Sequence, residues 1–341
     1  MDQVNALWLS VAAFAVTWVG IRNLIPVLTR RALLDLPDAR RNHETPVPRG
    51  AGFALVPVSA LCLAIGLVLG IPTGLPAASE VSFLAIAVAL ALVSAFDDLV
   101  SLRAATRFIA QAGLVALAVA SLPLSLNLSP ALPFFVERFV LWFFLLGFVN
   151  AYNFMDGIDG ITGVTTIAIA IGVLLVATPL GDLPLLPCLL IAASLGFLLH
   201  NWHPARIFLG DAGSVFVGFC VGSLLVALAL KGEIAAALIL PAYYLTDTGL
   251  TLLIRARRGE RIWLAHSEHA YQKAVRRGWK HDQVVLALTL NSLFCIALAV
   301  ISTRAPYAAV VAAYVSSLTF WVALRQGMVD ALAFRLSAKR K

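Results

Sequence analysis

The chain has 341 residues, of which 61% are hydrophobic and 13% charged, and its mean hydropathy is +0.92. These values exclude a soluble globular domain and are typical of a polytopic helical membrane protein. The formal charge of +7 comes from basic residues confined to particular loops, so it predicts membrane orientation and not nucleic-acid binding.

Eleven apolar runs are long enough for membrane-spanning helices, at about 17 to 25 residues per span. They are expected near residues 6–28, 52–71, 81–96, 106–124, 139–155, 161–178, 185–200, 213–230, 233–250, 283–301 and 306–324. No polar stretch is long enough for a separate soluble core. We therefore predict an all-α fold in which residues 1–341 form a single membrane domain.

The basic residues predict which side of the membrane each loop faces. If the loop after the first span is cytoplasmic, all of the 25 Lys and Arg residues except Arg138, Lys231 and Arg304 lie on the cytoplasmic side. The odd number of spans then predicts an external N-terminus and a cytoplasmic C-terminus. The polar motifs fall in five cytoplasmic loops, at about 29–51, 97–107, 153–162, 200–213 and 251–282. We therefore expect the polar motifs to gather at the cytoplasmic face.

The first of these loops is basic and rich in proline towards its end, which excludes a continuous helix. His43 and Arg49 lie in this Pro/Gly-rich frame, and both side chains are suited to binding an anionic phosphate. Arg30 and Arg31 are better explained as positive charges that fix the orientation of the chain.

The third predicted span ends in two adjacent carboxylates, Asp97 and Asp98. Like charges this close are stable only where a cation or a shared proton relieves their repulsion. Arg103 and Arg107 follow one helical turn apart, so they can balance the carboxylates or bind phosphate. The alternative is a hydrated span end without a ligand.

The most unusual stretch is 148–163, which places amides and carboxylates between two apolar runs. Asn150, Asn153, Asp156 and Asp159 recur every three residues, so on a helix they would lie along one side. Ionisable residues at membrane depth usually mark a substrate or ion path. The alternative is a polar loop that only turns the chain.

A fourth motif follows the seventh predicted span and contains Asn201, Phe208, Gly210, Asp211 and Ser214. The Gly-Asp-Ala-Gly-Ser sequence places a carboxylate, a hydroxyl group and free backbone N–H groups at a helix N-terminus, where anions are favoured. A carboxylate would repel a phosphate there unless a divalent metal lay between them.

The longest loop contains His266 and His269, in a His-x-x-His spacing. This spacing can form a zinc pair, but nothing nearby completes a tetrahedral ligand set. Hydrogen bonding to an anionic sugar phosphate is the better interpretation, and contact with anionic lipid headgroups is the alternative for the basic loop as a whole.

These motifs, in this order, resemble those of the polyprenyl-phosphate N-acetylhexosamine-1-phosphate transferases. The resemblance extends over about residues 29–280 and comprises Asp97-Asp98, Asn-Ala-x-Asn-x-x-Asp-Gly-x-Asp-Gly, Phe-x-Gly-Asp-x-Gly-Ser and His-x-x-His-x-Tyr-Gln. The last motif looks like that of the transferases that initiate O-antigen and related lipopolysaccharide synthesis. Relatives often have several lysines after the Asp pair, whereas this chain has only Arg103 and Arg107.

The resemblance implies a bacterial inner-membrane enzyme that transfers a HexNAc 1-phosphate from a UDP-N-acetylhexosamine to undecaprenyl phosphate with Mg²⁺, for which Mn²⁺ can substitute. It also allows a homodimer. By the same resemblance Asp211 and Asn153 would hold the metal, and Asp97 and Asp98 would be catalytic. The implied substrate contacts are Asn150, Asp156, Asp159, Asn201, Phe208, Gly210, Ser214, His43, Arg49, Arg103, Arg107, His266 and His269.

The identity of the sugar is left open, as is the choice between direct attack by the lipid phosphate and an aspartyl-phosphate intermediate. An ion-coupled membrane transporter is the alternative class, because buried carboxylates can relay protons or sodium. It is disfavoured because no inverted repeat is evident and the acidic residues gather at one predicted face.

Overall fold

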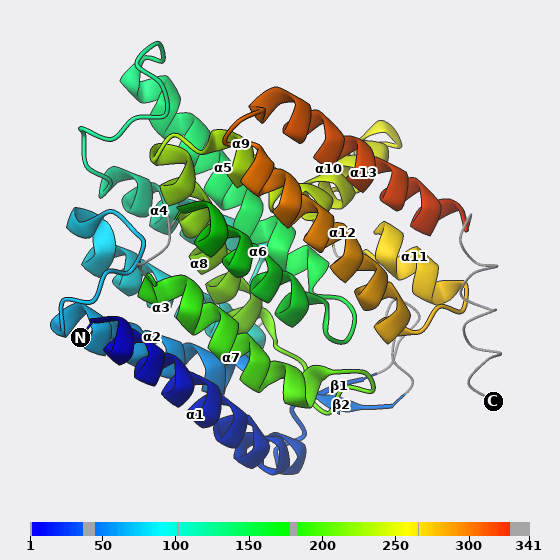
Figure 1. Cartoon of the computed structure of the whole chain (residues 1–341). Helices are drawn as coiled ribbons and strands as arrows, with labels where there is room; N and C mark the ends of the chain where they lie inside the picture. The colour runs from blue at the N-terminus through cyan, green and yellow to red at the C-terminus, as the bar shows by residue number, and fades with distance from the viewer. Residues whose placement is uncertain (1, 37–44, 101, 178–182, 265, 328–341) are drawn as a thin grey trace.

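The computed structural model describes residues 2–36, 45–100, 102–177, 183–264 and 266–327, and these form a bundle that is almost entirely helical (Figure 1). Apolar runs of this length become helices because a helix satisfies its backbone N–H and C=O groups within one segment, as hydrocarbon requires. A short antiparallel pair, β1 (Leu34–Asp35) and β2 (Val47–Pro48), departs from the predicted all-α fold.

Thirteen α-helices are present in the described part of the chain. The first half contains α1 (Asp2–Arg30), α2 (Gly52–Val68), α3 (Glu80–Val100), α4 (Ala104–Ala120) and α5 (Phe134–Met155). The second half contains α6 (Ile161–Ala177), α7 (Leu185–Asn201), α8 (Asp211–Leu230), α9 (Ile234–Ile239), α10 (Ala242–Arg257), α11 (Ala270–Arg276), α12 (His281–Ile301) and α13 (Pro306–Gln326).

Six helices in the described part of the chain are long and apolar enough to cross a membrane, namely α1, α3, α5, α8, α12 and α13. The apolar helices α2, α4, α6 and α7 are shorter. The chain is therefore a multi-helix membrane protein, while the total of eleven spans stays a prediction. The single helix expected at 233–250 is wrong, because the chain breaks between α9 and α10 at Pro241, which lacks the N–H that a continuous helix needs.

Helix α8 is the centre of the bundle, since all its residues from Ala212 to Leu230 are buried. It packs against α3 and α5, and small residues allow the close approach. A Cβ atom at Gly218 would lie 2.8 Å from Tyr152, and one at Gly222 would lie 2.7 Å from Leu145. The N-terminus of α8, at Asp211, is therefore held by a rigid and fully enclosed element.

The loops before α2 and α8 join at the end of the bundle where Figure 1 shows β1 and β2. The two residues before Gly52 donate their N–H groups to the Phe208 carbonyl oxygen, both at 2.9 Å. A Cβ atom at Gly52 would lie 2.5 Å from the backbone nitrogen of Gly213, so only glycine permits this contact. The contact brings Arg49, just before α2, beside Asp211.

Candidate active site

A polar cavity of about 220 Å³ lies among the ends of α5, α7 and α8 and the loop before α2. Eight of the residues expected from the sequence line it: Arg49, Asn153, Asp156, Asp159, Asn201, Phe208, Gly210 and Asp211. Four segments separated in the sequence therefore converge on one cavity. A polar cavity of this kind at the edge of a membrane bundle can enclose a charged ligand.

Arg49 joins two of the predicted acidic motifs. Its Nη2 lies 2.5 Å from Asp211 Oδ1 and 3.3 Å from Asp98 Oδ1. The side chains of Arg49, Asp98 and Asp211 are all partly exposed, so solvent and ligands can reach both ion pairs. A guanidinium between two carboxylates relieves the repulsion that they would otherwise exert on each other.

Arg107 makes the second link. Its Nη1 lies 2.7 Å from Asp97 Oδ2 and 3.7 Å from Asp211 Oδ2. The N–H of Leu102 also donates to Asp97 Oδ1 at 2.8 Å, which orients that carboxylate. We call Asp97, Asp98, Asp211, Arg49 and Arg107 the carboxylate–arginine cluster. It places the two acidic motifs, more than a hundred positions apart in the sequence, within reach of one ligand.

The donor set of this cluster fits a hard divalent cation. Asp97, Asp98 and Asp211 supply carboxylate oxygens, and Asn153, which has an amide oxygen, lines the same cavity as Asp211. Mg²⁺ prefers such oxygen ligands and is bound by one or two carboxylates together with phosphate oxygens. The Oγ of Ser214 donates to Asn153 Oδ1 at 2.9 Å, so the first turn of α8 orients the last turn of α5.

Asp156 and Asp159 follow the end of α5 and are not on it. The periodicity that predicted one continuous polar helix side is therefore wrong beyond Met155, where the helix ends. Burial raises the pKa of Asp156 to about 6, although a hydrogen bond from Thr162 Oγ1 to its Oδ1 acts in the opposite direction. Asp156 is thus a carboxyl group that can change its charge near neutral pH.

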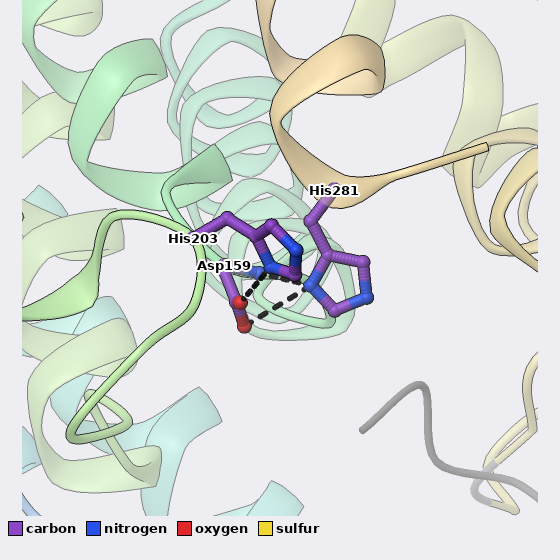
Figure 2. Close-up of side chains that lie close together, drawn as sticks. All are labelled: Asp159, His203 and His281. Atoms are coloured by element: carbon purple, nitrogen blue, oxygen red, sulfur yellow. Dashed lines mark hydrogen bonds and ion pairs between the residues drawn. The ribbon is translucent and has the colours of Figure 1, made fainter. Parts of the chain in front are cut away.

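Two neighbouring histidines, His203 and His281, both contact Asp159, as Figure 2 shows. The Nδ1 of His203 is 2.7 Å from Asp159 Oδ2, and the Nδ1 of His281 is 3.1 Å from Oδ1. Burial alone would raise the pKa of Asp159, but the hydrogen bonds and charge of His281, together with His203, hold that pKa below its usual value. The 2.7 Å distance from His203 Nδ1 to Asp159 Oδ2 is that of a hydrogen bond. We therefore interpret the three side chains as a hydrogen-bonded network that keeps Asp159 ionised.

Asn201, at the end of α7, connects the two loops that form the cavity. Its Oδ1 accepts a hydrogen bond from the N–H of Gly160 at 2.8 Å, and its Nδ2 donates to the carbonyl oxygen of Ile207 at 2.9 Å. Gly160 has φ of +80°, a conformation that other residues rarely adopt. Asn201 therefore shapes the cavity through both ends of its amide.

His266 and His269 lie next to the site and are not among the residues that line the polar cavity. Their rings stack on each other with centroids 4.9 Å apart, and His269 Nδ1 lies 3.4 Å from the fully buried Asp247. Burial, followed by the charge of His269, lowers the pKa of His266 to about 4, so this imidazole is neutral at neutral pH. Their contacts with a sugar phosphate stay a prediction.

A second pocket, apolar and of about 570 Å³, lies beside the carboxylate–arginine cluster between α4, α5 and α10. Arg107 and Asn150 line it together with aromatic side chains such as Phe108 and Trp263. Asn150 also donates to the Leu146 carbonyl oxygen at 2.9 Å. Arg107 therefore belongs to the cluster and to the wall of the apolar pocket at once.

Two further predicted site residues, His43 and Arg103, have no position in the site that the structure describes. His43 lies outside the described residues. Arg103 is exposed at the N-cap position of α4 and does not line either pocket. Between Arg103 and Arg107, the structure thus places only Arg107 beside the acidic motifs.

Three residues of the site region were not assigned from the sequence. His203 sits within the Asn-Trp-His-Pro segment next to Asn201, so its proximity to a polar motif was a usable signal. Asp247, an isolated carboxylate within an apolar run, was a second one. His281 had no such signal, because only the fold brings the start of α12 to Asp159.

Comparison with known proteins gives a consistent result. The sequence model of the family described as "Glycosyl transferase family 4" matches residues 81–229. A "Probable undecaprenyl-phosphate N-acetylglucosaminyl 1-phosphate transferase" of Bacillus subtilis (strain 168) is 27% identical over 302 residues, covering 82% of this chain and 81% of that protein. A "Phospho-N-acetylmuramoyl-pentapeptide-transferase" of Chlamydia abortus is 32% identical over 167 residues, which cover 46% of this chain and 47% of the relative.

Proposed function

The chain belongs to the superfamily of polyprenyl-phosphate N-acetylhexosamine-1-phosphate transferases, and from this premise we propose that it transfers a HexNAc 1-phosphate from a UDP-N-acetylhexosamine to undecaprenyl phosphate, releasing UMP. The observation that carries the proposal is the carboxylate–arginine cluster, which opens to a polar cavity on one side and an apolar pocket on the other. We further propose that the product initiates O-antigen or a related surface polysaccharide, on the basis of the His-Ser-Glu-His-Ala-Tyr-Gln sequence at 266–272.

In this reaction an oxygen of the lipid phosphate attacks the β-phosphorus of the donor. The bond from that phosphorus to the UMP oxygen breaks, and UMP leaves with the α-phosphate. The protein must hold two anions together and balance the charge on the leaving UMP. Arg49 lines the polar cavity and Arg107 lines the apolar pocket, and both guanidinium groups lie near Asp211.

The proposed metal is Mg²⁺, with Mn²⁺ as a substitute, held by Asp211 and Asn153. When bound, the metal supplies positive charge that stabilises the diphosphate in the transition state. Asp97 and Asp98 act on the lipid phosphate, with Asp97 oriented by Arg107 and by the N–H of Leu102. We favour direct attack by the phosphate, since it is already largely ionised near neutral pH and a covalent aspartyl-phosphate step gains little.

The apolar pocket is the proposed site for the start of the polyprenyl chain. Gly147 lines it on α5, and a Cβ atom there would meet no other atom within 4 Å, so a larger side chain would enter the pocket without displacing the protein. Gly147→Phe should raise the KM for the lipid acceptor about tenfold, because it removes apolar surface from the acceptor, and should leave the KM for the donor unchanged. Steady-state kinetics with each substrate varied in turn measures both values.

The matched control is Gly113→Phe on α4, where a Cβ atom likewise meets nothing within 4 Å but the position is outside the pocket. It should behave like the unmodified protein. Equal effects of the two substitutions on the acceptor KM would contradict the assignment of the pocket.

We also propose that the site faces the cytoplasm, in the bacterial inner membrane, because of the distribution of basic residues. Ala78 and Ile262 are both exposed and lie in loops predicted to be on opposite sides. A cysteine at 78 should react with an impermeant thiol reagent added outside intact cells, whereas one at 262 should react only after the membrane is opened. Labelling of the native cysteines should be weak, because Cys62, Cys188, Cys220 and Cys295 are not exposed. The reverse labelling pattern would overturn the orientation.

The direct test of function is release of UMP by purified protein. It should require both a UDP-N-acetylhexosamine and a polyprenyl phosphate. An ion-coupled transporter, the alternative class, would release no UMP under any combination of the two.

A further inference from the structure

Within the described part of the chain, Asp159 has room for one more hydrogen-bond donor, and Asp159 lines the polar cavity. Its Oδ2 accepts from His203 Nδ1 at 2.7 Å and from the N–H of Ala205 at 3.1 Å. Its Oδ1 has His281 as a neighbour at 3.1 Å. Because a carboxylate oxygen accepts about two hydrogen bonds, Oδ2 is saturated and Oδ1 is not.

The contacts of His281 also determine whether its second ring nitrogen, Nε2, is a hydrogen-bond donor or an acceptor. The backbone N–H of Asp159 donates to His281 Nδ1 at 3.2 Å, so in the neutral ring the proton is on Nε2. In the charged ring both nitrogens carry protons, and Nδ1 then donates to Asp159 Oδ1. In either state Nε2 is a donor. Figure 2 shows this second nitrogen pointing away from Asp159, and His281 lines the polar cavity.

Asp159 and His281 therefore present an acceptor beside a donor, in a cavity that Phe208 also lines. Uracil has an N3–H donor flanked by two carbonyl acceptors, so its edge complements this pair. Cytosine held in the same position would turn its N3 acceptor towards the carboxylate, and it could pair with Asp159 only by shifting so that its 4-amino group faces that residue.

We infer that His281 is a specificity-determining residue that donates from Nε2 to a carbonyl oxygen of the uracil base of the donor nucleotide, next to Asp159. This inference rests on the proposed function, since it requires that the polar cavity hold the nucleotide. His203 has a different part, because its Nδ1 contacts the other carboxylate oxygen of Asp159, Oδ2, and its ring lies beside that of His281, with centroids 5.0 Å apart.

Two substitutions distinguish a His281 side chain that hydrogen-bonds the uracil base from one that only orients Asp159. In His281→Gln the side-chain amide can place a donor near the position of Nε2. In His281→Asn the amide reaches only the position of Nδ1, so the contact with Asp159 is kept and the outer donor is lost. A residue that only braced Asp159 would tolerate Asn better than Gln, whereas a residue that reads the base would tolerate Gln better than Asn.

The experiment is titration of UMP and of CMP into the purified full-length protein in detergent with Mg²⁺. We expect the Kd for UMP to rise about tenfold in His281→Asn, the size of one lost hydrogen bond, and the preference for UMP over CMP to shrink by a similar factor. His281→Gln should keep most of the affinity for UMP and most of the preference for UMP over CMP. Asp282→Asn is the control at the next position of α12, where the side chain accepts a hydrogen bond from the N–H of Gln283, and it should match the unmodified protein.

Thermal unfolding of each variant checks that it is folded, and the ratio of UMP to CMP affinity is measured within one preparation, so it does not depend on the folded fraction. Unchanged preference in His281→Asn, or better UMP binding by Asn than by Gln, would overturn the inference while leaving the proposed function intact. An unmodified protein that binds UMP no better than CMP and releases no UMP from a UDP-sugar would instead overturn the proposed function itself.

Discussion

Asp211→Asn protein should fold and insert into membranes but release UMP about a thousandfold more slowly than the unmodified protein. The substitution keeps the shape of the side chain and removes its charge. Asp211 is the one carboxylate in contact with both guanidinium groups of the carboxylate–arginine cluster, at 2.5 Å from Arg49 and 3.7 Å from Arg107. It is also the proposed carboxylate ligand of the metal at the start of α8.

The measurement is the rate of UMP release at a series of Mg²⁺ concentrations, with thermal unfolding in detergent as the check on folding. Glu233→Gln is the control, because it removes a carboxylate at the N-cap of α9, outside the polar cavity. It should leave the rate unchanged. A near-normal rate in Asp211→Asn, or a rate in the unmodified protein that persists in excess chelator, would contradict the metal assignment.

Arg49→Gln should lower kcat/KM by about a hundredfold, a loss typical of an electrostatic contact to a transferred phosphate. Arg49 is the bridge between Asp98 and Asp211, so its removal leaves two facing carboxylates with less compensation. The repulsion between them should weaken binding of the anionic donor. Arg49→Lys should recover only part of the loss, because an ammonium group restores the charge but not the planar fork of the guanidinium.

Arg31→Gln is the matched control for Arg49, since it removes an exposed arginine from the same connection between α1 and α2. It should keep normal kinetics. Equal losses in Arg31→Gln and Arg49→Gln would show that the loop needs positive charge in general and not a guanidinium at position 49. Full recovery in Arg49→Lys would show that the fork geometry has no role.

The helical membrane architecture could be predicted because apolar runs of span length have few alternatives in hydrocarbon. Hydropathy does not show the break at Pro241, since apolar residues continue on both sides of it. The two-residue strands β1 and β2 pair with each other within the connection between α1 and α2. The N–H of Phe208 also donates to the Pro48 carbonyl oxygen at 2.8 Å, a contact with the loop before α8 that no local pattern encodes.

The candidate site was predictable where chemistry is concentrated in short motifs, as in Asp97-Asp98 and the segment that contains Asp211. Sequence alone could not show which charges meet. Only the close approach of Gly52 and Gly213 explains why Arg49 contacts Asp211, while Arg103, equally well placed in sequence, does not line the site. His281 was missed for the same reason, since it is distant in sequence from the carboxylate it contacts.

The most direct test of the account uses a UDP-N-acetylhexosamine labelled in its β-phosphate, incubated with undecaprenyl phosphate and the purified protein in Mg²⁺. Transfer of sugar 1-phosphate predicts that the label moves quantitatively into the lipid fraction while unlabelled UMP appears in equal amount. Label that stays in water-soluble UDP while the sugar enters the lipid would mean simple glycosyl transfer, and would contradict the reaction that we assign to the carboxylate–arginine cluster.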